Sequence, residues 1–163
     1  HTRGFVQHYD FGNGSFDEFF ECFLLGEVDF GDYFANLVPW YKSRGQDNIL
    51  FLTYEQMKTQ PLESICSIGS FLGAGAAAVV HDRKILKDVI RNSSYDSMSR
   101  DQQRWSSQRP DNMPAFVRKG QVGDWLNYFS PDQARRLADK FDERTLGTDL
   151  KTLWPEALGA ARA

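Results

Sequence analysis

The sequence predicts a helix-rich α/β fold with one buried parallel strand and about seven helices. Residues 48–54, Asn-Ile-Leu-Phe-Leu-Thr-Tyr, form a continuous apolar run that is typical of a strand covered on both faces. An amphipathic helical pattern opens at Pro61 soon after this run, which gives one βα unit. Helical periodicity dominates elsewhere. A single strand is too little sheet for a complete α/β domain, so the sequence indicates the helix-rich half of one.

Capping signals mark the first two helices. Ser15 and Glu18 form a capping box, and phenylalanines at helical spacing follow, so we expect a helix that ends at Gly26. A second helix is expected over residues 31–44. Pro39 should kink this helix or mark its start, because proline disrupts a helix interior.

Four later segments have helical patterns. One helix should begin at Pro61 and end at Gly73, and the others should span Ala76 to Arg91, Ser94 to about Arg100, and the capping box at Ser130–Gln133 to Gly147. Residues 101–114 are polar and without periodicity, and we expect a loop there. Residues 73–78 match the relaxed dinucleotide fingerprint GxGxxA, but a helix rather than a strand precedes them. We therefore interpret them as a helix–helix turn.

Composition excludes several classes of partner. The chain has 163 residues with a net charge of −3, so a nucleic-acid partner is disfavoured, and no apolar run approaches the length of a membrane span, roughly 20 residues. Cys22 and Cys66 lie on apolar helix stripes, which predicts two reduced core thiols and suits a reducing compartment. His1, His8 and His81 are scattered, and we expect no metal site.

Residues 118–125, Arg-Lys-Gly-Gln-Val-Gly-Asp-Trp, are the most informative stretch. Arg118 offers a bidentate fork and Lys119 a point charge for a phosphate. Gly120 would let a ligand approach backbone N–H groups, and the helix start expected at Gly123 would add partial positive charge. The segment is therefore either a phosphate-binding loop or an ordinary charged loop.

Residues 118–125, followed by Asn-Tyr-Phe at 127–129, closely resemble the RKGxxGDW…F signature of the cytosolic sulfotransferases. Residues 48–58 resemble the strand of that family that ends in Tyr-Glu-Asp-Met-Lys. Further similar segments occur in family order, at residues 14–17, 25–28, 71–73, 93–98 and 146–150. The resemblance implies that residues 1–163 are the carboxy-terminal part of a single sulfotransferase domain, which is P-loop nucleotide-transferase-like, and that its amino-terminal half is not in this sequence.

The resemblance also implies an activity. The family transfers a sulfuryl group from 3′-phosphoadenylyl sulfate to a hydroxyl or amine of a small-molecule acceptor, and adenosine 3′,5′-bisphosphate is the product. By this resemblance Arg118, Lys119 and Gly120 would hold the 3′-phosphate. The adenine would contact four other residues: Tyr54 through its hydroxyl, Ser93 at the ring edge, Tyr95 by stacking, and Met98 in the same pocket. A cytoplasmic location is expected.

Two departures from the family qualify this expectation. The family's phosphosulfate loop, acid–base histidine and catalytic lysines lie in the amino-terminal half, so we expect no catalytic residue here. The dimer motif KxxxTVxxxE falls on Leu126, Ser130, Pro131 and Arg135, which all differ, and the oligomeric state stays open. Two functions are compatible with the sequence: a sulfotransferase represented by its carboxy-terminal half, or a non-catalytic nucleotide-binding or interaction module built from the half-fold.

Overall fold

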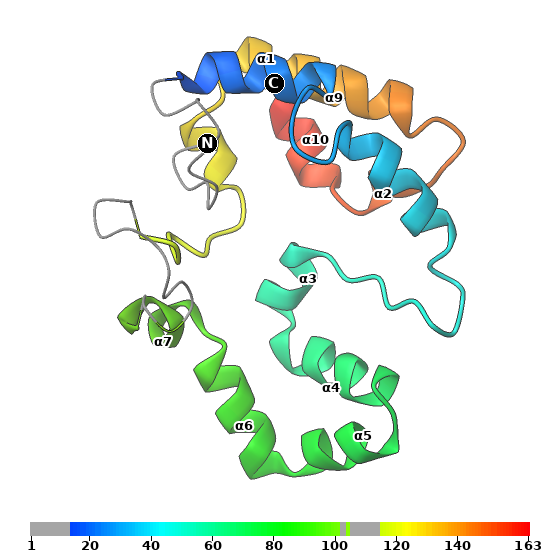
Figure 1. The fold of residues 1–163 in the computed structure, drawn as a ribbon, viewed down its shortest axis with the longest axis vertical. Coiled ribbons are helices and arrows are strands. Elements are labelled where there is room, and N and C mark those ends of the chain that lie inside the picture. The colour runs from blue at the N-terminus through cyan, green and yellow to red at the C-terminus, as the bar shows by residue number, and fades with distance from the viewer. Residues whose placement is uncertain (1–13, 102–103, 105–114) are drawn as a thin grey trace. The chain divides into compact units, whose positions relative to one another are not determined.

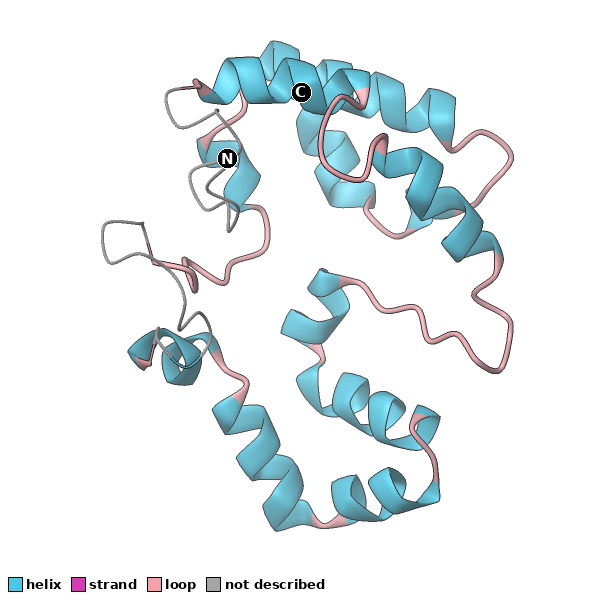
Figure 2. Ribbon diagram, viewed as in Figure 1, coloured by secondary structure: helices cyan, strands magenta, loops and turns pink. Residues whose placement is uncertain are grey.

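The computed structural model describes residues 14–101, 104 and 115–163, which form two compact units (Figure 1). Unit 1 contains residues 14–49 and 123–163, and unit 2 contains the described part of residues 50–122. Within the described ranges every regular element is a helix (Figure 2). Nine of these helices are α-helices and two are 3-10 helices. The helix-rich character of the prediction is confirmed.

Unit 1 is built around α9. Helices α1 (Phe16–Leu25), α2 (Tyr33–Lys42) and α10 (Pro155–Arg162) each pack on α9 (Pro131–Arg144). Its two 3-10 helices are η1 (Asp124–Asn127) and η2 (Leu150–Thr152). The core of this unit consists of the buried side chains Phe20, Phe34, Tyr41, Ala134, Ala138, Phe141 and Leu150.

Capping chemistry fixes both ends of α1 and the start of α9 as the sequence predicts. The Ser15 hydroxyl accepts a hydrogen bond from the Glu18 N–H, and the Glu18 carboxylate accepts one from the Ser15 N–H. Ser130 and Gln133 form the same reciprocal pair at the start of α9. Gly26 ends α1 with φ of 78°, in the left-handed region that glycine favours. Pro39 lies inside α2 and does not mark its start.

Asp32 joins α2 to α9. Its carboxylate accepts hydrogen bonds from the N–H groups of Phe34 and Ala35, and it pairs with Lys140 at 2.7 Å and Arg144 at 3.6 Å. Burial raises the pKa of Asp32, but the hydrogen bonds from Lys140 and from the two N–H groups outweigh burial and hold this pKa below its usual value. The ionised form of Asp32 therefore stabilises the folded unit.

Unit 2 is a chain of packed helices. Its elements are α3 (Tyr54–Thr59), α4 (Pro61–Phe71), α5 (Ala74–His81), α6 (Arg83–Asn92) and α7 (Tyr95–Arg100). Each helix packs on the next along the chain, and α4 also packs on α6. The closest approach is at Gly69, where an added Cβ would lie 2.5 Å from the Val80 Cγ2. Only glycine fits there, so α4 and α5 can pack tightly.

The expected strand is wrong for the described residues. Residues 49–53 are irregular, and the helix α3 begins at Tyr54 within the expected strand. Leu50 is exposed, whereas a strand covered on both faces would bury it. A parallel strand needs backbone partners on a neighbouring strand. The described residues supply no other strand with which this run could form a sheet.

Other helix boundaries also differ from the prediction. Helix α9 ends at Arg144, before the expected end at Gly147. The helix expected from Ala76 to Arg91 is two helices, because the Asp82 carboxylate accepts hydrogen bonds from the N–H groups of Lys84 and Ile85 and starts α6. Helices α3 and α10 were not predicted. The expected loop over residues 101–114 lies outside the described residues, except for residues 101 and 104.

Three smaller expectations concern residues 73–78, the two cysteines and the histidines. Helix α4 ends just before Gly73 and α5 begins at Ala74, so the expected helix–helix turn is confirmed at Gly73, but residues 74–78 are already part of α5. Cys22 and Cys66 are free and half-buried, so neither lies fully in the core as expected, and their reduced state stays a prediction. Of the three histidines, His1 and His8 lie outside the described residues.

Candidate nucleotide site

All seven predicted site residues belong to unit 2, where they occupy three segments. The first is the start of α3, the second is the junction of α6 and α7, and the third is the irregular segment that follows residue 114 (Figure 1). The start of α3 carries Tyr54, and the junction of α6 and α7 carries Ser93, Tyr95 and Met98. The irregular segment carries Arg118, Lys119 and Gly120. The geometry of each segment decides which side chains can act together.

The junction of α6 and α7 is held by two adjacent serines. Ser93 is the C-cap of α6, and its hydroxyl donates to the carbonyl oxygens of Val89 at 2.9 Å and Ile90 at 3.3 Å. Ser94 caps α7, because its hydroxyl accepts a hydrogen bond from the Ser97 N–H at 3.2 Å. The Ser94 hydroxyl also donates to the Arg91 carbonyl at 2.7 Å. These bonds fix the position at which α7 begins.

The hydrogen bonds of Ser93 also define its chemistry. A serine hydroxyl has one proton and two acceptor lone pairs. The proton of Ser93 is already directed to carbonyl oxygens at the end of α6, so the exposed oxygen is available as an acceptor. Such an oxygen can accept a hydrogen bond, and the exocyclic amino group of adenine is a hydrogen-bond donor.

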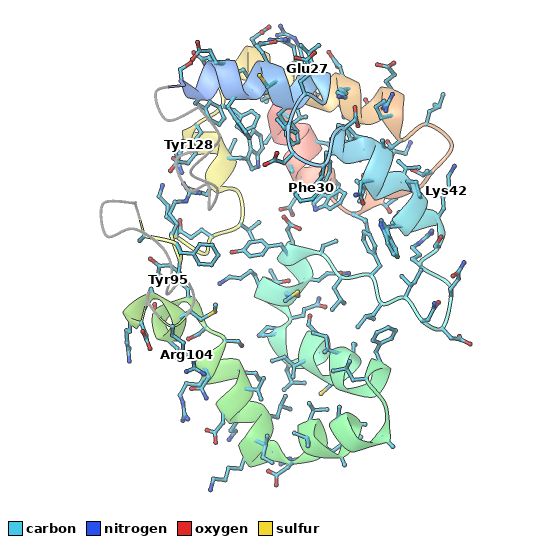
Figure 3. All side chains as sticks on the ribbon, in the orientation of Figure 1. Glu27, Phe30, Lys42, Tyr95, Arg104 and Tyr128 are labelled. Atoms are coloured by element: carbon cyan, nitrogen blue, oxygen red, sulfur yellow. The ribbon has the colours of Figure 1, made fainter. Side chains whose placement is uncertain are left out.

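Tyr95 and Met98 lie one turn apart on α7 and are both half-buried. Side chains at positions i and i+3 of a helix lie on the same face. Tyr95 is the first residue of the helix, directly after the Ser94 cap (Figure 3). The two side chains can therefore contribute an aromatic plane and a soft apolar surface to one face of α7.

Gly120 contacts Tyr95. A Cβ added at Gly120 would lie 2.8 Å from the Tyr95 Cδ2, 2.9 Å from its Cβ and 3.0 Å from its Cγ. Gly120 also has φ of 61°, in the left-handed region that L side chains rarely adopt. Glycine is therefore required at this position for two independent reasons, and the contact joins the Arg118–Gly120 segment to the start of α7.

The cations of the third segment differ in exposure. Arg118 is half-buried and Lys119 is exposed. The two are consecutive, and the left-handed Gly120 follows them. Residues 83–119 contain nine Arg or Lys residues but only four Asp or Glu residues, although the whole chain has a net charge of −3. The sequence around the candidate site is thus locally basic, which favours an anionic ligand.

Tyr54 stands apart from the other predicted residues. It is the first residue of α3, directly after the N-cap Thr53, which forms a capping box with Gln56, and it is 48% exposed. Helix α3 packs on α4, whereas α7 packs on α6. The structure therefore brings Tyr95 and Gly120 together but carries Tyr54 on a different helix of the same unit.

Sequence reasoning did not find the contact between Tyr95 and Gly120. From the sequence, Gly120 was expected to let a ligand approach the backbone, and Tyr95 was expected to stack on the adenine. The two positions are far apart in sequence, and no periodicity connects a short helix with an irregular segment. The available signal was the glycine itself, because a glycine directly after two cations indicates a positive φ or a close neighbour.

The described residues contain no group of three or more His, Cys, Asp or Glu side chains that could hold a metal ion. No helix within the described ranges has both the length and the apolar character that crossing a bilayer requires.

Comparison with known proteins gives consistent matches. A family model described as the sulfotransferase domain matches residues 3–149. Sulfotransferase 1C2 of Rattus norvegicus is 31% identical over 137 residues, which cover 84% of this chain and 46% of the rat protein. Sulfotransferase 6B1 of Homo sapiens is 34% identical over 139 residues, which cover 84% of this chain and 43% of the human protein.

A solved structure is similar to the chain as well. The crystal structure of mouse sulfotransferase SULT7A1 complexed with PAP matches with a TM-score of 0.63 and 29% sequence identity. The match covers 88% of this chain and 52% of the mouse chain. The chain thus spans about half the length of the relatives that it matches.

Proposed function

Because this chain belongs to the sulfotransferase family, we propose that it carries the adenine and 3′-phosphate part of the donor site of a sulfotransferase. The enzyme would move a sulfuryl group from 3′-phosphoadenylyl sulfate to a hydroxyl or amine of a small acceptor. Residues 1–163 would be the carboxy-terminal part of a single sulfotransferase domain. We also propose a cytoplasmic location, which the two free cysteines support.

One observation carries the proposal: the side chain of Tyr95 lies against Gly120, the residue that follows two consecutive cations in the sequence. A nucleotide with an additional phosphate on its ribose needs an aromatic plane for the base and positive charge for the phosphate. Arg118 can form two parallel hydrogen bonds to one phosphate, and its half-burial strengthens such bonds by limiting competition from water. Lys119 would add a second, more exposed charge.

The remaining proposed contacts fit the adenine. The Ser93 oxygen would accept a hydrogen bond from the exocyclic amino group, since its own proton is already committed to the end of α6. Met98 would line the same pocket from the next turn of α7. Tyr54, which is exposed and lies on a different helix from Tyr95, would reach the adenine with its hydroxyl.

The transfer itself exchanges two bonds to sulfur. The acceptor oxygen or nitrogen would form a bond to sulfur while the bond from sulfur to the 5′-phosphate oxygen breaks, and the acceptor loses its proton to a base. The residues proposed here would hold the nucleotide end and take no part in that exchange. Their contribution would be to fix the donor in one orientation, which lowers the entropic barrier to reaction.

Calorimetric titration tests this proposal. Adenosine 3′,5′-bisphosphate should bind the chain more tightly than adenosine 5′-monophosphate, because only the former has the 3′-phosphate. Binding to the chain should be weaker than binding to a sulfotransferase chain that also contains the other half of the domain, since about half of the site would be present. If this chain and the longer sulfotransferase chain bind the bisphosphate equally tightly, the half-site assignment is contradicted. If this chain does not prefer the bisphosphate over the monophosphate, the 3′-phosphate site is contradicted.

An activity assay separates the two functions that the sequence leaves open. A longer protein that contains these residues should transfer sulfate from 3′-phosphoadenylyl sulfate to a panel of phenols, alcohols and amines. Nucleotide binding without transfer to any acceptor would instead support a non-catalytic nucleotide-binding module.

A further inference from the structure

We infer that Tyr95 is a positioning residue for the phosphate loop, which we define as residues 118–120. Its side chain holds Gly120 in the left-handed conformation and thereby fixes the direction in which Arg118 and Lys119 leave the backbone. This inference rests on the proposed nucleotide site and assigns Tyr95 a second role beside stacking on the base.

The contact is made by the root of the Tyr95 side chain. The atoms nearest to the Cβ position of Gly120 are Cδ2, Cβ and Cγ, at 2.8 to 3.0 Å. The positions of Cβ and Cγ depend on the backbone of α7 and on one torsion, so they cannot move far without moving the helix. The Ser94 hydroxyl anchors that backbone, since it accepts from the Ser97 N–H and donates to the Arg91 carbonyl.

The phosphate loop has less structure of its own. Residues 115–121 form no regular helix or strand. A glycine in such a segment can populate both positive and negative φ, which would direct the preceding cations in different ways. A rigid neighbour at Gly120 removes this freedom before the ligand arrives, and such preorganisation increases affinity by reducing the entropy lost on binding.

Positioning and stacking make different predictions about selectivity. A residue that only stacks on adenine affects all adenine nucleotides to the same extent. A residue that positions the phosphate loop affects the nucleotide with a 3′-phosphate more strongly than the one without it. The informative quantity is the ratio of the Kd for adenosine 5′-monophosphate to the Kd for adenosine 3′,5′-bisphosphate.

Two substitutions separate the roles. Tyr95→Leu removes the aromatic plane but keeps a branched side chain with Cβ, Cγ and Cδ atoms, whereas Tyr95→Ala removes everything beyond Cβ. We expect Tyr95→Ala to lower the selectivity ratio about tenfold, the effect of one weakened charge-assisted hydrogen bond. Tyr95→Leu should weaken the binding of both nucleotides while the selectivity ratio stays within about twofold of its value in the unmodified chain.

Hydrogen exchange on the ligand-free chain gives a second readout. The amides of residues 119–122 should exchange faster in Tyr95→Ala than in the unmodified chain, and Tyr95→Leu and Tyr95→Phe should not change them. Tyr33→Ala removes a tyrosine ring from α2 in unit 1 and serves as the matched control, with no effect expected on the loop or the ratio. Tyr95→Ala could expose all of unit 2 to exchange and so hide the effect on the loop. In that case Tyr95→Val, which keeps Cγ atoms, is the test, and it should show smaller changes of the same kind in the exchange of residues 119–122 and in the selectivity ratio.

The outcomes are distinguishable. An unchanged ratio together with unchanged exchange of residues 119–122 in Tyr95→Ala or Tyr95→Val would overturn the positioning role. An unmodified chain without preference for the bisphosphate would overturn the proposed function. The exchange measurement would then decide the positioning role alone, because faster exchange supports it and unchanged exchange refutes it.

Discussion

Replacing Gly120 by alanine should destabilise unit 2 through two separate effects. The φ of 61° at Gly120 lies in the left-handed region, where an L residue costs roughly 1–2 kcal/mol. The new methyl group would also overlap Tyr95, with Cδ2 at 2.8 Å and Cβ at 2.9 Å. Overpacking of this kind costs about 1–3 kcal/mol, so the two effects together predict a loss of about 2–5 kcal/mol.

Gly147 provides the matched control. It has φ of 78°, but an added Cβ there would have no neighbour within 4 Å. Gly147→Ala should therefore show the backbone cost alone, about 1–2 kcal/mol. The difference between the two substitutions measures the overlap with Tyr95.

Native-state hydrogen exchange is the suitable assay, because it reports the opening free energy of each segment separately. The amides of α7 and of residues 115–122 should lose protection in Gly120→Ala, whereas those of α9 should not. Tyr95→Ala in the Gly120→Ala background should recover part of the loss, but only part, since the Tyr95 Cβ remains at 2.9 Å from the ideal position. If Gly120→Ala costs no more than Gly147→Ala, the tight contact that we describe is wrong.

Three further substitutions test other features. Arg118→Ala should weaken donor binding in a complete enzyme by about ten- to a hundredfold, and Lys119→Ala by less, because only Arg can bind one phosphate through two parallel bonds; titration calorimetry measures both. Asp32→Asn should lower stability at neutral pH. The pKa of Asp32 is lowered in the folded state, so its carboxylate stabilises the fold fully above the unfolded pKa of about 3.9. This stabilisation disappears as the pH falls through the lower folded pKa. Thermal melts should therefore show that the melting temperatures of the Asp32→Asn variant and the unmodified chain converge in acid. Asp82→Ala should cost about 1 kcal/mol by removing the cap of α6, as loss of protection in α6 would show.

The sequence predicts helices well where their ends carry a local signal. Ser15 with Glu18 and Ser130 with Gln133 satisfy backbone N–H groups within the same few residues, so their effect does not depend on the rest of the fold. Asp82 was missed as a cap because apolar residues continue at helical spacing on both sides of it. The strand expected at residues 48–54 was wrong for the opposite reason. A strand depends on backbone partners elsewhere, and local sequence does not reveal whether they are present.

The candidate site shows the same division. Motif resemblance identified the cations Arg118 and Lys119 and the aromatic Tyr95 as separate contributors, and the structure carries all three in unit 2. The contact that links them through Gly120 joins segments that are distant in sequence. Packing of this kind depends on the path of the chain between the segments, which periodicity and capping do not specify.

The two units differ in how their residues are distributed along the chain. The bonds that join the segments of unit 1 link Asp17 to Gln133, Glu21 to Arg136, and Arg44 to Asp149, each pair more than 100 residues apart. The described residues of unit 2 lie between those segments and are contiguous in sequence, apart from the undescribed gaps within residues 102–114. During synthesis on a ribosome, all of the described unit 2 is therefore made before α9 exists. Helix α1 and Arg44 cannot make these bonds until α9 and Asp149 have been synthesised, so unit 2 can fold co-translationally before unit 1 assembles.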